Sequence, residues 1–148
     1  AQSAQPIISY NYGAHLTERI SRTLRVSLFT AIVCGLSVMV CLWLGATGIV
    51  RLFLDPQENA YGLAVEGLPL FAMCAVFFAV NIAFIGYYQS IEKAMVSTVY
   101  TLLRGIFFLV PCFILLPCLI GVPGLWLAIP AAELLTCIVI SVRYVRRE

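Results

Sequence analysis

The chain has 148 residues, of which 62% are hydrophobic and 11% are charged, and its mean hydropathy is +1.01. A water-soluble domain carries roughly 25% charged residues, so this composition excludes a soluble globular fold and indicates a lipid environment. The chain has nine Lys and Arg against seven Asp and Glu residues, which gives a net charge of +2. The basic residues do not form one stripe, so we expect no nucleic acid as partner.

Four runs of predominantly apolar residues are long enough to cross a bilayer, which needs about 20 helical residues. The chain starts without an initiator Met, and we expect residues 1–13 to be the end of a truncated transmembrane helix. The predicted order then is a basic cytoplasmic loop (14–25), a transmembrane helix (26–54), an extracytoplasmic loop with a short helix (55–66), a transmembrane helix (67–88), a cytoplasmic loop (89–93), a transmembrane helix (94–116), an extracytoplasmic turn (117–123), a transmembrane helix (124–142) and a cytoplasmic tail (143–148).

Several residues mark the breaks between these spans. Asp55, Pro56 and Glu58 fit a helix N-cap, a first-turn proline and an early acid, which predicts the short helix. Pro111 and Pro130 lie inside spans, where each is expected to kink its helix. The tight turn of the last hairpin is predicted from Pro117, Gly121, Pro123 and Gly124.

Positive charges fall on alternate connections, which predicts the orientation because cytoplasmic loops hold an excess of Lys and Arg. The connections 55–66 and 117–123 contain neither residue, and Arg51 is the exception near an outer end. We therefore expect a multi-pass protein of the cell (inner) membrane with a cytoplasmic C-terminus. The seven cytoplasmic charges are Arg19, Arg22, Arg25, Lys93, Arg143, Arg146 and Arg147.

Two ionisable residues, Arg104 and Glu133, fall in the middle of predicted spans, where a charge is a functional hypothesis by default. Each lies about 15 Å from the cytoplasmic end of its span, at 1.5 Å per residue, so the antiparallel hairpin predicts a buried ion pair. Two interpretations stay open. The pair fixes the register of two helices, or it takes part in moving an ion or substrate.

Other polar side chains recur at helical spacing, and they either line an aqueous cavity or bond neighbouring helices. The first such stripe consists of Gln2, Gln5, Ser9 and Tyr12, and the second of Asn81, Tyr88 and Gln89. Aromatic residues 77, 78, 84, 87 and 88 form a wall for an organic cation or face lipid, with Tyr87 and Tyr88 as interfacial anchors. The six cysteines include no Cys-x-x-Cys pair, so we interpret them as small residues in helix packing and expect no metal and no cofactor.

Four collinear blocks resemble the multidrug and toxic compound extrusion (MATE) family of transporters. They resemble the end of its eighth helix, the end of its tenth helix, its eleventh helix and its twelfth helix. The corresponding residues here are 5–14, then 81–82 with 86–94, then 102–104 with 106–111, and finally 121–126 with 130, 131 and 133–135.

The resemblance implies an all-α integral membrane fold of twelve helices in two bundles of six, of which this chain supplies part of the C-terminal bundle. The missing N-terminal bundle of the same protein is then its partner. The implied function is secondary active efflux of bulky, often cationic organic compounds, coupled to inward Na⁺ or H⁺ by alternating access, and not an enzyme activity. The family's tenth-helix carboxylate has no counterpart here, since Asn81 is the prominent deep polar residue, and Glu92 stands where the family often has glycine.

Two alternatives stay open. A flippase for lipid-linked precursors, from the same superfamily, predicts several buried Arg or Lys residues, and only Arg104 qualifies. A multi-pass scaffold or assembly subunit, which is a protein of another class, predicts no transport pathway and paired polar groups throughout the spans.

Overall fold

The computed structural model describes residues 4–146, and in this range it contains helices and no β-strand. Four helical rods are long and apolar enough to cross a membrane, which confirms the predicted all-α membrane class. The elements are α1 (Gln5–Gly13), α2 (Thr17–Arg51), α3 (Asn59–Ala72), α4 (Cys74–Ser90), α5 (Ala94–Leu102), the π-helical segment η2 (Leu103–Phe108), α6 (Leu109–Ile120) and α7 (Val122–Val145).

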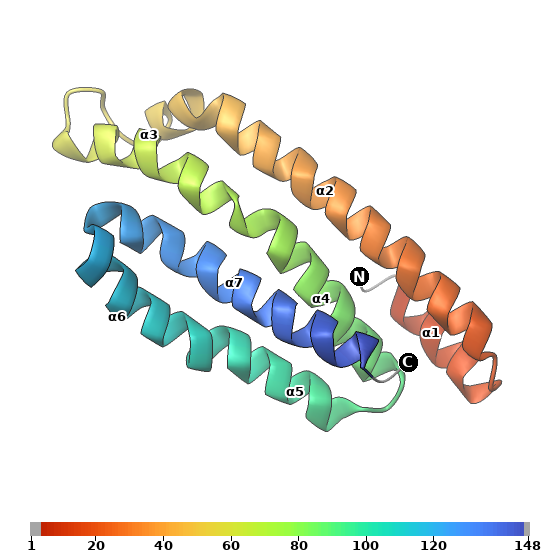
Figure 1. The fold of residues 1–148 in the computed structure, drawn as a ribbon. Coiled ribbons are helices and arrows are strands. Elements are labelled where there is room, and N and C mark those ends of the chain that lie inside the picture. Colours follow the sequence, from red (N-terminus) through yellow and green to blue (C-terminus); the bar gives the residue numbers. More distant parts are fainter. Residues whose placement is uncertain (1–3, 147–148) are drawn as a thin grey trace.

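The connections between the helices alternate between two ends of the bundle (Figure 1). The end that holds the α1–α2 connection, the α4–α5 connection and the last turn of α7 is called the basic end below. The other end holds residues 52–58 and the α6–α7 turn, and is called the Gly121 end. Within the bundle, α4 packs between α2 and α7, α7 packs against η2 and α6, and α1 lies against α2 and α4.

The predicted loop 14–25 is wrong from Thr17 onward, because α2 begins there. Ile20 and Leu24 are buried, one helical turn apart, while Arg19 and Arg22 on other faces are exposed. This amphipathic segment buries its apolar side against the neighbouring helices, so the helix continues after the apolar run has ended.

The short helix predicted within residues 55–66 is also absent as a separate element. Asp55 instead forms a turn, in which its backbone oxygen accepts from the Glu58 amide at 2.9 Å and its Oδ1 accepts from the Gln57 amide at 3.3 Å. An aspartate that bonds the backbone two residues ahead is a common turn former. Helix α3 then begins at Asn59, eight residues before the predicted start of the second span at Gly67 (67 − 59 = 8).

The predicted turn 117–123 shrinks to Gly121, which has φ 69° and ψ −145° and joins α6 directly to α7. Pro117 is tolerated inside α6, and its carbonyl accepts from the Gly121 amide at 2.9 Å. Pro123 falls in the first turn of α7, where a missing amide hydrogen costs nothing. A side chain at Gly124 would overlap the backbone of Leu116, so the hairpin closes on a glycine.

The two prolines expected to kink their spans behave differently. Pro111 lies three residues after η2, the segment in which the helix has π geometry. Proline has no amide hydrogen to donate, and a π-helical segment is one way for a helix to accommodate it. Pro130 lies within a continuous α7, which runs to Val145 and therefore includes the start of the tail predicted at 143–148.

The interpretation of the cysteines as helix-packing residues applies to only some of them. All six are free thiols, and Cys74 and Cys112 are buried between helices. Cys34, Cys41 and Cys118 are exposed, so they do not pack between the described helices.

We predict that two glycines of α2 respond oppositely to alanine. A Cβ at Gly35 would lie 2.8 Å from the Val76 Cα and 3.0 Å from the Ala75 oxygen, whereas a Cβ at Gly48 would meet no described atom within 4 Å. Alanine favours a helix interior by about 1 kcal/mol over glycine, so Gly48→Ala should keep or raise the thermal unfolding midpoint in detergent. Gly35→Ala should lower it, since the overlap costs about 1–3 kcal/mol. An equal rise for both variants would contradict the close contact of α2 with α4.

Candidate functional site

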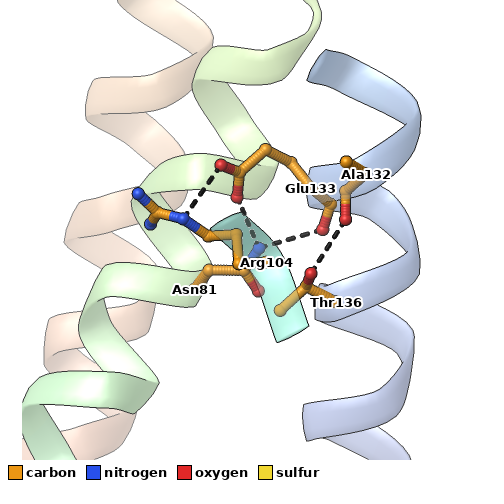
Figure 2. A network of polar contacts seen from close by, with 5 residues as sticks. All are labelled: Asn81, Arg104, Ala132, Glu133 and Thr136. Carbon is orange, nitrogen blue, oxygen red and sulfur yellow. Dashed lines mark hydrogen bonds and ion pairs between the residues drawn. The ribbon is translucent and has the colours of Figure 1, made fainter. Parts of the chain in front are cut away.

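The pair predicted from equal membrane depth meets in the middle of the bundle. Nε of Arg104 lies 3.2 Å from Oε1 of Glu133, and the two side chains are 21% and 6% exposed. Arg104 extends from η2 and Glu133 from α7, as Figure 2 shows. The guanidinium also lies over the ring of Phe78 on α4, with Cζ 4.6 Å from the ring centroid, which adds a cation–π contact.

Asn81 on α4 completes the coordination of this carboxylate (Figure 2). Its Nδ2 donates to Oε2 of Glu133 at 2.7 Å and to the Glu133 backbone oxygen at 2.9 Å. Asn81 is fully buried. Each carboxylate oxygen therefore has its own donor, Arg104 on one side and Asn81 on the other, and the three side chains tie α4, η2 and α7 together.

The sequence contained a signal for this third member. Asn81 lies nine residues before Ser90, the end of α4, which is about 14 Å of helix. That depth matches the depth estimated for Glu133. Equal depth therefore predicts the contact of Asn81 with Glu133 once neutral side chains count as partners. Thr136, one turn further along α7, bonds only within its own helix, to the Ala132 oxygen at 2.8 Å.

Two atoms of the site remain without a hydrogen-bond partner although they are buried. They are Oδ1 of Asn81, which only accepts, and Nη1 of Arg104, which only donates. The site thus keeps one free acceptor and one free donor beside the carboxylate.

The stripe on α1 is remote from this site and contacts the end of α4. Gln2 lies outside the described residues. Gln5 Nε2 donates to Gln89 Oε1 at 3.2 Å, and Ser9 Oγ donates to the Ser90 oxygen at 3.2 Å. Tyr12 is exposed. A cavity of about 500 Å³ at the basic end is lined by Ser9, Tyr12, Gly13, His15, Gln89, Ser90 and Glu92.

Tyr88 is buried, so the expectation that it is an interfacial anchor is wrong. It is 3% exposed, because α5 and α7 cover its face of α4. Its ring centroid lies 5.4 Å from that of Tyr100 and 5.2 Å from that of Tyr87. Tyr144 on α7 extends this aromatic cluster with contacts to Phe84 and Tyr87 at 5.5 and 6.0 Å.

Glu92 stands where the resemblance to the MATE family predicts a glycine in many members. Its backbone is left-handed, with φ 59°. It follows the last turn of α4, and the Lys93 amide donates back to the Tyr88 oxygen at 3.0 Å. Glycine is the usual residue at this point of a helix end. His15 repeats the arrangement after α1, with φ 56°.

Comparison with protein families gives one match, to the MatE family model over residues 1–114. Comparisons with curated proteins and with solved structures gave no match. The matched residues include α1 to η2, and therefore Asn81 and Arg104, whereas Glu133 lies beyond them. Four membrane-length helices agree with this result. Since the matched residues make up most of the chain, the protein belongs to the MatE family of membrane transporters.

Proposed function

We propose that this chain forms part of a secondary active multidrug exporter. It moves bulky, often cationic organic compounds across the cell membrane in exchange for Na⁺ or H⁺, by alternating access. Membership of the MatE family supports the proposal, and so does the carboxylate held inside the bundle. The basic end faces the cytoplasm in this proposal, because Lys and Arg gather on the cytoplasmic side of membrane proteins.

The burial of the Glu133 carboxylate inside the bundle is the observation that carries the proposal. A carboxylate within the hydrocarbon region is costly, and such residues mark paths of ions or protons. Its oxygens hold Arg104 and Asn81, so a cation or proton that binds Glu133 competes with these contacts. Because the contacts join α4, η2 and α7, the competition shifts the relative stability of two packings of these helices, as alternating access requires.

The unpaired polar atoms favour a transporter over a scaffold. A scaffold within the bilayer needs every polar group to be paired, since hydrocarbon offers no partner. Four buried side-chain atoms among the described residues have none. This pattern is typical of a region that binds a polar ligand or water.

The coupling is tested by ethidium efflux from vesicles that hold the protein expressed from its complete gene. An imposed Na⁺ or proton gradient should raise the initial efflux rate severalfold, because inward movement of the coupling ion drives export. Protein-free vesicles measure the leak. Efflux that is indifferent to both gradients would rule out coupled antiport, whichever substrates are carried.

We predict that Glu133→Gln impairs transport far more than it impairs accumulation in the membrane. The variant keeps the shape of the side chain but loses the charge, which leaves Arg104 without its carboxylate. Initial efflux rates should be normalised to the amount of protein in the membrane. The matched control is Glu66→Gln, an exposed carboxylate on α3 whose loss should leave the normalised rate unchanged.

A double variant separates the two roles of the ion pair. Removing one partner of a buried pair costs about 3–5 kcal/mol, whereas removing both is often nearly neutral. The double variant Arg104→Gln with Glu133→Gln should therefore accumulate at least as well as Glu133→Gln alone. If Glu133 binds the coupling ion, gradient-driven efflux stays lost. Recovery of efflux together with accumulation would sink the coupling role and leave a purely structural pair.

A further inference from the structure

Three of the four buried side-chain atoms that lack a hydrogen-bond partner among the described residues belong to one stretch of helix. Ser97 Oγ, Tyr100 OH and Arg104 Nη1 all belong to one rod, formed by α5 and η2. Their spacing of three and four residues places them on one helix face over about 10 Å. The fourth atom, Oδ1 of Asn81, lies on α4 and contacts the same carboxylate as Arg104. These four residues are called the polar seam below.

The seam faces the interior of the bundle and not the surrounding lipid. Ser97 and Tyr100 are each 1% exposed, and Asn81 is fully buried. The Tyr100 ring packs against Tyr88 on α4, and Arg104 reaches Glu133 on α7. Unpaired groups here cost free energy, since neither protein nor hydrocarbon supplies the missing hydrogen bonds.

The chemistry of the four atoms selects the missing partner. Nη1 of Arg104 can only donate, so a cation does not satisfy it. Oδ1 of Asn81 can only accept, so an anion does not satisfy it. The hydroxyl groups of Ser97 and Tyr100 do both. Water alone among common small ligands donates and accepts equally, and buried waters are normally held by two to four such groups.

Apolar clusters border the seam on both sides, and the cluster around Tyr100, Tyr88 and Ile91 lies toward the basic end. Beyond the Arg104–Glu133 pair, an apolar cluster joins η2, α6 and α7. Its buried members are Cys112, Ala128 and Ala132, with Phe108, Leu109, Leu116 and Ala131 packed against them. Toward the basic end, Ser97 lies in the first turn of α5, close to the connection at Lys93.

We propose that bound water molecules supply the missing hydrogen-bond partners of the polar seam, beside the Glu133–Arg104 pair. Water beside Glu133 is then a donor or acceptor for a proton that is exchanged there. That use rests on the proposed transport function, whereas the presence of water does not.

Hydroxyl-radical footprinting tests for the water directly, on the protein from its complete gene in lipid nanodiscs. X-rays split bound water where it lies, so a buried residue beside it is oxidised without contact with bulk solvent. After each rate is divided by the intrinsic hydroxyl-radical reactivity of its residue type, Tyr100 should be oxidised severalfold faster than Phe84, which is also buried, at 5% exposure, and lies in the same hydrophobic cluster. Equal, slow oxidation of both residues would overturn the proposal.

The sign of a stability change gives a second test. In a dry seam, Tyr100→Phe removes an unpaired hydroxyl and raises the thermal unfolding midpoint. In a hydrated seam, the same substitution removes the hydrogen bond between the Tyr100 hydroxyl and bound water. It should then lower the midpoint by roughly 3 °C. Tyr10→Phe, at an exposed tyrosine of α1, is the matched control and should leave the midpoint unchanged. A rise for Tyr100→Phe alone would contradict bound water.

The two proposals fail separately. If Tyr100 is oxidised but efflux ignores both ion gradients, the seam holds water and the coupled antiport is wrong. If efflux is coupled but Tyr100 stays as unreactive as Phe84, the transport function stands and the bound water of the seam is wrong.

Discussion

A carboxylate inside hydrocarbon must be neutralised by groups that the protein itself supplies, and Glu133 imposes this constraint on the bundle. Arg104 provides the charge and Asn81 provides a neutral donor, each to one carboxylate oxygen. Because these residues come from separate helices, the requirement of one side chain fixes how α4, η2 and α7 meet. The apolar contacts around them are permissive by comparison, since lipid tails solvate the same surfaces equally well.

The sequence predicted the fold class and the centre of the site, and both for simple physical reasons. Span length follows from bilayer thickness, and the depth of Arg104 and Glu133 follows from the rise of a helix. The sequence marks Asn81 as the deep polar residue of its span, but the ion pair predicted from charge alone does not include this neutral partner of Glu133. The roles of these residues in transport remain predictions.

Helix ends and side-chain neighbours were less predictable. Charged residues end an apolar run without ending a helix. Helix α2 therefore begins at Thr17, well before the start of the predicted span at residue 26. A lone aspartate next to proline fits both a helix cap and a turn, and Asp55 forms the turn. Tyr88 is covered because α5 and α7 pack over it, which is a tertiary contact that no local pattern reports. The π geometry of η2 likewise had no signal beyond Pro111.

The one-residue connection at Gly121 has a mechanical consequence for the hairpin. With α6 and α7 joined so tightly, and Gly124 lying against Leu116, the two helices cannot slide past each other at that end. Any relative motion is then a rotation about this fixed pivot, and displacement grows with distance from it. Glu133 lies about 18 Å along α7 from the pivot, so a small change of angle moves it little, while the far end of the helix at Val145 swings twice as far.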